Sequence, residues 1–266
     1  MRFAKLHGLG NDFVLLDLRG GGQPLPAQRA IDLCDRHRGI GADGVLTLLP
    51  GRGQGSIRML IQNSDGSIPE MCGNGARCAA LWVTTGGGDR PGSGHVLIET
   101  EAGPRACDVT ATGPRDGLVE VDMGVAEVQP ARRLSAGSTS FEGIPVSVGN
   151  PHRVLFVDGP RDGLEQLARQ VGPILCEAEN ANIELVSRLS AQRYAVSVWE
   201  RGAGLTQACG TGACAVAAAA VARGEVRRGD DVTIELPGGT LTIRIDADNR
   251  VRMRGPAQLV FTGDLD

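Results

Sequence analysis

Aromatic residues and long apolar runs are scarce in this 266-residue chain. Only 3% of the residues are aromatic, so base-stacking surfaces for single-stranded nucleic acid are disfavoured. The net charge of −4 gives no overall attraction to a phosphate backbone. The longest apolar run covers residues 213–222 and is far shorter than the roughly 20 residues that a membrane-spanning helix needs. We therefore expect no nucleic-acid partner and no membrane partner.

Lysine and histidine are also rare. Lys5 is the only lysine, which disfavours a pyridoxal phosphate enzyme because that cofactor needs a Schiff-base lysine. The chain has four histidines, and the spacings Cys72–Cys78 and Cys209–Cys214 are wider than those of zinc sites. We expect neither a cofactor nor a metal.

The seven cysteines do not indicate a disulfide framework. Their number is odd, and the N-terminal sequence MRFAKLHGLGND contains no apolar stretch of signal-peptide length. We therefore expect a cytoplasmic protein with reduced thiols. Apolar residues at 41% and charged residues at 22% are typical of a soluble globular chain.

Several landmarks recur at nearly the same spacing along the chain. Cys72 begins the sequence CGNGA and Cys209 begins CGTGA, 137 positions later. Asn63 precedes the first of these cysteines by nine positions, and Glu200 precedes the second by nine. The dipeptide Gly-Asn at residues 10–11 recurs at residues 149–150. This pattern indicates a duplicated unit of about half the chain.

Both halves show the same order of apolar patterns. We expect an α/β protein (α+β, with mixed sheets) made of two pseudo-symmetric domains, each a mixed sheet wrapped around one apolar helix, with the boundary near Asp122. Residues 1–122 would form the first half and residues 123–255 the second. The predicted helices cover residues 27–36, 76–85, 164–171 and 213–223. The predicted strands cover residues 3–6, 13–17, 45–49, 57–62, 96–100, 106–110, 119–123, 144–148, 154–157, 183–186, 194–198, 232–236, 241–245, 251–254 and 259–261.

The two repeated motifs place Cys72 and Cys209 at the starts of helices. The dipole and the N–H groups of a helix start favour a thiolate, which lowers the cysteine pKa, and they can bind a carboxylate. Pseudo-symmetry would direct both helix starts at one shared cleft. One thiolate could then remove the proton beside a carboxylate while the opposite thiol supplies another, which inverts the stereocentre.

Other interpretations of these cysteines remain open. A structural or redox disulfide could join Cys72 to Cys209. The remaining cysteines are expected to be small core residues, namely Cys34, Cys78, Cys107, Cys176 and Cys214. Arg77 is interpreted as a structural charge on the outer face of its helix.

Four motifs in order, HGLGNDF, MCGNGARC, GNPH and ERGAGLTQACGTGA, resemble the diaminopimelate epimerase family. The similarity extends over almost the whole chain. It implies a cofactor-independent isomerase that interconverts LL- and meso-diaminopimelate for lysine and peptidoglycan precursor synthesis. It also implies a homodimer, and a C-terminal segment from about Pro256 to residue 266 that packs on the first domain.

The resemblance also implies roles for individual residues. Cys72 and Cys209 would be the acid/base pair, and His152 and Glu200 would tune their pKa values. Asn11 would lie beside the reacting centre, whose carboxylate would be bound by Gly73, Asn74, Gly210 and Thr211. The distal amino-acid end of the substrate would be held by Asn63, Asn150, Asn182, Glu200 and Arg201.

Structural explanations exist for the same polar residues. Asn11 and Asn150 follow glycine in turns that suit asparagine without any ligand. Glu200 and Arg201 could be an exposed surface pair, and His152 could be a core residue. Some family members carry Gln at the position of Gly44, so a side-chain contact made there is absent.

Two alternative functions remain. A related two-cysteine racemase or epimerase could act on proline-like amino acids, although such a substrate lacks the second charged end that Glu200 and Arg201 suit. A thiol-redox protein without turnover would instead use a Cys72–Cys209 disulfide as its working state.

Overall fold

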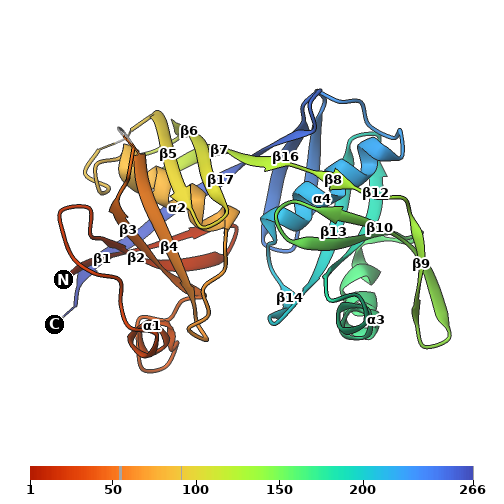
Figure 1. Cartoon of the computed structure of the whole chain (residues 1–266), viewed down its shortest axis with the longest axis horizontal. Helices are drawn as coiled ribbons and strands as arrows, with labels where there is room; N and C mark the ends of the chain where they lie inside the picture. Colours follow the sequence, from red (N-terminus) through yellow and green to blue (C-terminus); the bar gives the residue numbers. More distant parts are fainter. Residues whose placement is uncertain (54–55, 91, 266) are drawn as a thin grey trace. The chain divides into compact units, whose positions relative to one another are not determined.

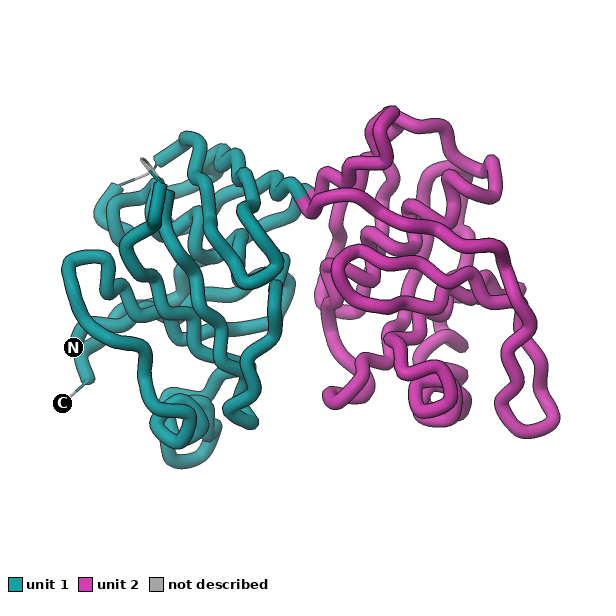
Figure 2. The backbone as a smooth tube through the Cα atoms, viewed as in Figure 1, with its two compact units in different colours: residues 1–122, 254–266 teal, residues 123–253 magenta. Residues whose placement is uncertain are grey.

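The computed structural model describes residues 1–53, 56–90 and 92–265 (Figure 1). The chain divides into two compact units, shown in different colours in Figure 2. Unit 1 comprises Met1–Asp122 and Arg254–Asp266, and unit 2 comprises Met123–Met253. Each unit combines mixed β-sheet with two α-helices, which confirms the predicted α/β fold class.

Unit 1 surrounds a central helix with strands. Its helices are α1 (Ala27–Cys34) and α2 (Gly73–Thr84). Its strands are β1 (Arg2–Gly8), β2 (Asn11–Asp17), β3 (Gly44–Pro50), β4 (Ser56–Asn63), β5 (Gly94–Thr100), β6 (Gly103–Ala111) and β7 (Asp116–Val125). The last strand, β17 (Arg250–Asp264), begins in unit 2 and pairs with both β1 and β7. The pairings therefore form a ring around α2, which contacts β1 through β6.

Unit 2 follows the same plan. Its helices are α3 (Leu164–Glu179), preceded by the short 3-10 turn η1 (Arg161–Gly163), and α4 (Gly210–Ala222). Its strands are β8 (Glu127–Val128), β9 (Arg132–Ala136), β10 (Thr139–Ser147), β11 (Pro151–Phe156), β12 (Asn182–Ser190), β13 (Arg193–Glu200), β14 (Gly204–Thr206), β15 (Asp231–Leu236) and β16 (Gly239–Ile245). Helix α4 contacts β8, β10, β11, β12, β15 and β16, whereas α3 packs on β9, β12, β13 and β14.

Strand pairing reveals the duplication directly. In unit 1, β2 and β3 are parallel, β3 and β4 antiparallel, and β4 and β5 parallel. The corresponding pairs of unit 2, β11–β12, β12–β13 and β13–β15, have the same directions in the same order. Asn63 ends β4 and Glu200 ends β13, as their common spacing from a cysteine suggests. The repeat read from the sequence is therefore a repeat of topology.

The two central helices are buried along most of their length, and α4 has unusually small, apolar side chains. Alanine supplies most of α4, and all but a few of the residues in α2 and α4 are buried. A helix buried on every side needs such a sequence, because each face contacts strands rather than water. Small side chains also let the surrounding strands approach closely, and this holds each helix start in a fixed place.

Helix α3 is longer than the sequence suggests. The predicted helix ends at residue 171, but the observed helix continues through Gly172 and Pro173 to Glu179. Proline removes the hydrogen bond to the carbonyl four residues earlier, that of Arg169, and Arg169 is exposed to water. Burial of Leu175 and Cys176 in the core beneath the helix outweighs this loss.

Four strand assignments also differ from the sequence-based expectation. Strand β17 runs without interruption through Pro256, where two separate strands were predicted. The strands β8, β9 and β14 were not predicted; β8 and β14 are only two and three residues long. No helix among the described residues is long and apolar enough to cross a membrane.

Replacement of Leu175 by alanine tests the packing of α3 on its sheet. Leu175 is 1% exposed, so Leu175→Ala should lower the free energy of unfolding by about 2–5 kcal/mol in a urea titration. The neighbouring Ile174 is 47% exposed, and Ile174→Ala should change it by less than about 0.5 kcal/mol. Equal effects of the two substitutions would contradict this packing.

Candidate active site

Cys72 caps the start of α2 with its side chain. Its backbone is extended, its carbonyl accepts the first helical bond from the Ala76 N–H, and the Gly75 N–H donates to its Sγ over 3.4 Å. A side chain at Gly75 would collide with Leu46, since its Cβ would lie 2.9 Å from Cδ2. The predicted position of this cysteine at a helix start is confirmed, and the residue is partly exposed.

A chain of polar contacts orients the groups around Cys72. The guanidinium of Arg77 donates to Asn74 Oδ1 over 2.9 Å, and Asn74 Nδ2 donates to Asn11 Oδ1 over 2.9 Å. The Cys72 thiol lies within 3.9 Å of the same Asn11 oxygen. Because a guanidinium can only donate, it fixes the orientation of both amides and leaves Asn11 Oδ1 as an acceptor beside the sulfur.

The interpretation of Arg77 as a charge on an outer helix face was wrong. Its side chain is fully buried, and its Nε donates to the carbonyl of Pro256 in β17 over 3.1 Å. The last strand closes the ring over α2 and thereby removes the outer face that the sequence pattern suggested. The side chain also fills the space over Gly8, where an added Cβ would lie 2.8 Å from the guanidinium.

A cluster of charged side chains also holds Asn11, through its amide nitrogen. Asn11 Nδ2 donates to Asp43 Oδ2 over 2.8 Å, and Arg36 donates to Asp43 Oδ1 over 2.7 Å. Asp12 accepts from Arg36 and from Lys5. Burial alone would raise the pKa of Asp12, but the bonds from Arg36 and Lys5 outweigh it and lower the pKa to about 2.

The local backbone structure explains why position 44 is occupied by glycine. Gly44 pairs with Asn63 across β3 and β4, and a Cβ there would lie 2.7 Å from the backbone oxygen of Gln62. No side chain fits at this position unless the backbone moves. Asn63 itself is partly exposed and donates from Nδ2 to Ser67 over 2.9 Å.

Cys209 caps α4 in the same way as Cys72 caps α2. The Gly212 N–H donates to its Sγ over 3.4 Å, and the Thr211 hydroxyl lies 3.5 Å from the sulfur. Gly210 and Thr211 form the first turn of the helix, where N–H groups have no intrahelical acceptor. The side chain of Cys209 is buried, in contrast to that of Cys72.

Carboxyl groups dominate the electrostatics at Cys209. Burial, together with the nearby carboxyls of Glu200 and Glu184, raises the pKa of this thiol well above its ordinary value. Bonds from Thr211 and Gly212 act in the opposite direction but are outweighed. The expectation that the helix start lowers the pKa was therefore wrong for this cysteine. Burial also raises the pKa of Glu200, which accepts a hydrogen bond from Thr206 over 2.5 Å.

His152 lies in a buried polar group beneath the Cys209 loop. Its Nδ1 is 2.6 Å from Glu184 Oε1 and its Nε2 is 2.9 Å from Asn150 Oδ1. Both His152 and Glu184 are completely buried. Glu184 was missed in the sequence analysis, although a single carboxylate within the apolar run of residues 183–186 was a signal for it.

The remaining predicted residues of unit 2 lie near the end of β13. Asn182, at the start of β12, is buried and accepts from the Arg201 N–H over 2.9 Å. The guanidinium of Arg201 is exposed and donates to Asn180 Oδ1 over 3.1 Å. The polar residues of unit 2 are thus grouped around the start of α4 and the adjoining ends of the strands.

Neither the other cysteines nor the cavity in unit 2 adds residues to the surroundings of Cys72 and Cys209. Cys34, Cys78, Cys107, Cys176 and Cys214 are buried, which confirms their core role. No group of three or more His, Cys, Asp or Glu side chains in the described part of the chain could hold a metal ion.

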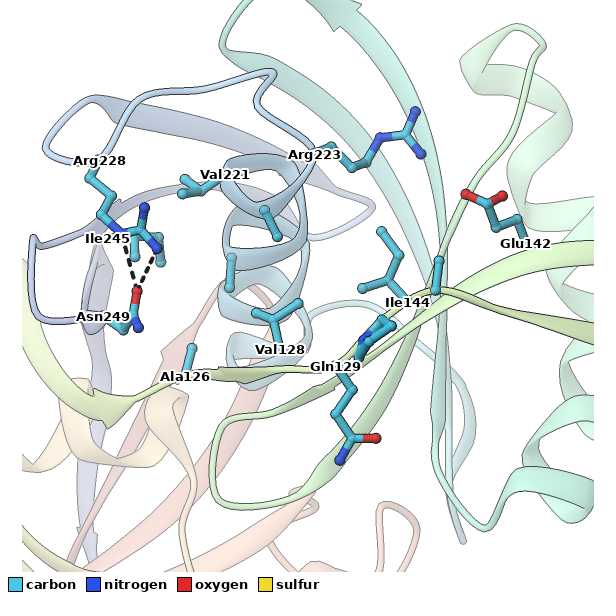
Figure 3. Close-up of a pocket in the computed structure, with 14 residues that line it drawn as sticks. Ala126, Val128, Gln129, Glu142, Ile144, Val221, Arg223, Arg228, Ile245 and Asn249 are labelled. Carbon is cyan, nitrogen blue, oxygen red and sulfur yellow. Dashed lines mark hydrogen bonds between the residues drawn. The ribbon is translucent and has the colours of Figure 1, made fainter.

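Unit 2 contains a cavity of about 480 Å³. The residues that line it include Ile144, Val221 and Asn249, which are drawn in Figure 3. The cavity lies toward the C-terminal end of α4, away from Cys209.

The fold of this chain also occurs in solved structures of other proteins. A solved hydroxyproline epimerase from Agrobacterium vitis has the same fold, with a TM-score of 0.77, and the match covers 99% of this chain and 91% of that one. The two share 14% sequence identity, so this similarity establishes the fold alone.

Sequence similarity is far more specific. The family model for diaminopimelate epimerase matches residues 3–129 and 144–260. Diaminopimelate epimerase of Synechocystis sp. is 44% identical over 100% of this chain and 99% of its own length. The enzyme of the same name from Synechococcus elongatus is 41% identical, with 100% and 98% covered. The chain belongs to the diaminopimelate epimerase family.

The charge cluster beneath Asn11 predicts a pH-dependent contribution to stability. Because the folded-state pKa of Asp12 is depressed, its stabilisation is present above the ordinary value of 3.8 and is lost as the pH falls through about 2. Asp12→Asn should therefore lower the free energy of unfolding by about 1–2 kcal/mol at pH 7, and by much less near pH 2.

The control is Asp108→Asn, which removes a carboxylate that pairs with His95 on the surface. Urea titrations of wild type and both variants at the two pH values provide the comparison. Exposed pairs contribute little, so Asp108→Asn should change the unfolding free energy by less than about 1 kcal/mol at either pH. A loss for Asp12→Asn that is the same at both pH values would refute the assignment.

Proposed function

We propose that the protein interconverts LL- and meso-diaminopimelate by proton transfer at one α-carbon, without a cofactor. The observation that carries this proposal is the thiol at the start of the central helix in each half of a duplicated fold. Membership of the diaminopimelate epimerase family, with near-complete mutual coverage, supplies the substrate.

In this reaction Cys72 and Cys209 act on opposite faces of the α-carbon. One sulfur, as thiolate, takes the α-proton, and the electron pair of the broken C–H bond moves toward the adjacent carboxylate. The other sulfur, as thiol, gives its proton to the opposite face and becomes a thiolate. The roles are exchanged when the other epimer is the substrate.

The helix starts stabilise the charge that develops on the carboxylate. The residues proposed for this task are Gly73, Asn74, Gly210 and Thr211, whose N–H groups or side chains lie next to the two cysteines. Donors that are already oriented in a buried place stabilise a transition state without reorganisation. Asn11, held by Asp43 and Asn74, would position the group that faces Cys72.

The distal end of the substrate would be bound by residues that suit a second amino acid group. Arg201 would pair with its carboxylate and Glu200 with its ammonium, with amides from Asn63, Asn150 and Asn182 beside them. His152 and Glu200 would also tune the cysteine pKa values. Proline-like substrates have no such second end, so we rank that alternative below diaminopimelate.

The proposed reaction also indicates where in the cell and in which pathways the protein acts. We expect it to act in the cytoplasm, where thiols stay reduced, and to supply precursors of lysine and peptidoglycan. We expect a homodimer, by analogy with the family, which light scattering on the purified protein would test.

Isotope exchange tests the proposed reaction. In D₂O with a reductant, proton NMR should show loss of the α-proton signal of LL-diaminopimelate as the meso isomer appears. Cys72→Ala and Cys209→Ala should each remove turnover, because each lacks one of the two proton-transfer groups. Cys214→Ala, which shortens a buried core cysteine one turn further along α4, is the matched control and should retain most activity.

Exchange with free proline but not with diaminopimelate would overturn the substrate assignment. Turnover that survives in either Cys72→Ala or Cys209→Ala would overturn the mechanism. Turnover that survives complete oxidation of the thiols would do the same.

A further inference from the structure

The two halves of the protein differ in polarity at two pairs of corresponding strand positions near their cysteines. In unit 1, Phe13 pairs with Gly44 in the parallel strands β2 and β3. In unit 2, His152 pairs with Asn182 at the corresponding place in β11 and β12. Two positions further along β3 and β12 lie Leu46 and Glu184. The apolar residues Phe13 and Leu46 of one half are thus replaced by His152 and Glu184 in the other.

Both Leu46 and Glu184 reach the glycine that donates to the cysteine sulfur. A Cβ on Gly75 would lie 2.9 Å from Leu46 Cδ2, and a Cβ on Gly212 would lie 2.9 Å from Glu184 Oε1. The same point on Gly212 is 3.3 Å from Cys209 Sγ. The carboxyl of Glu184 and the sulfur of Cys209 therefore both lie close to the α-carbon of Gly212.

Stability does not explain why Glu184 is buried here. One of its oxygens, Oε2, has no hydrogen-bond partner among the described residues, and a buried unsatisfied oxygen costs about 1–3 kcal/mol. Unit 1 shows that the same topology can carry an apolar pair at these positions. At this pair of corresponding positions only unit 2 carries a buried unsatisfied oxygen, which calls for an explanation other than packing.

His152 is in contact with both neighbouring polar side chains. Its Nε2 lies 2.9 Å from Asn150 Oδ1, and its Nδ1 lies 2.6 Å from Glu184 Oε1. Glu184 thereby orients His152 and Asn150 as one unit. The same oxygen, Oε1, is the atom nearest to a Cβ added at Gly212.

We propose that Glu184 is a positioning residue of the Cys209 site, which orients His152 and Asn150 and keeps the proton on the Cys209 sulfur in the resting enzyme. The ionisable groups in electrostatic contact with this site are Glu184 of β12, His152 of β11 and Glu200 at the end of β13. Burial raises the pKa of the Cys209 thiol most, followed by Glu200 and then Glu184, and the contribution of Glu184 agrees with this role. The proposal rests on the proposed function, in which Cys209 is the proton donor for one of the two epimers.

Alkylation of Cys209 tests the role without requiring turnover. At pH 8 iodoacetamide reacts with the thiolate fraction, and mass spectrometry of the peptides gives a separate rate for each cysteine. Glu184→Gln keeps the size and can still bond to His152 but removes the charge. It should accelerate modification of Cys209 about threefold or more, which corresponds to about half a pKa unit, while the rate at Cys72 stays within about twofold.

Three controls separate charge from loosened packing. Glu184→Asp keeps the carboxylate and should keep the rate at Cys209 near that of wild type. The double variant His152→Phe/Glu184→Leu copies the apolar pair of unit 1 and should accelerate Cys209 as Glu184→Gln does. Cys214 lies one turn further along α4 and is fully buried, so it should stay unmodified in every variant.

An unchanged or slower rate at Cys209 in Glu184→Gln would overturn the proposal. Joint modification of Cys209 and Cys214 would also overturn it, because it would show that Glu184 only holds α4 in place. A faster rate confined to Cys209 would support the proposal even if the protein failed to turn over diaminopimelate. That last result would refute the proposed function alone.

Discussion

The hydrogen bond from a glycine N–H to a cysteine sulfur is the constraint on which the rest of the structure depends. It occurs at the start of α2 and again at the start of α4, each time over 3.4 Å. A glycine is the third residue after each cysteine, and a Cβ there would collide with Leu46 in unit 1 and with Glu184 in unit 2. The small apolar helices and their encircling strands hold these two caps in place.

The two halves of the duplicated fold place a cysteine at the same position, but the residues around Cys72 differ from those around Cys209. Cys72 is partly exposed and lies beside an amide oxygen whose orientation is set by the buried Arg77. Cys209 is buried and lies beside two carboxyl groups that favour its protonated form. In the proposed mechanism the two sulfurs begin each turnover in opposite protonation states, and the different surroundings of the two cysteines agree with that requirement.

The sequence predicted the features that local chemistry controls. Both helix-start cysteines, the repeat and the apolar central helices follow from short motifs and composition. Arg77, Glu184 and the length of α3 do not, because each depends on distant packing. The β17 strand buries Arg77, the register of β12 brings Glu184 to Gly212, and the sheet beneath α3 outweighs the effect of Pro173.

The central claim is that two different groups transfer the proton on opposite faces of one carbon. The most direct test measures deuterium at the α-carbon of both epimers in D₂O at early times, starting from each epimer in turn. The account predicts that the product epimer is fully deuterated while the remaining substrate still carries its original proton. Deuterium that enters the remaining substrate as fast as the product would indicate a single exchanging base and contradict the account.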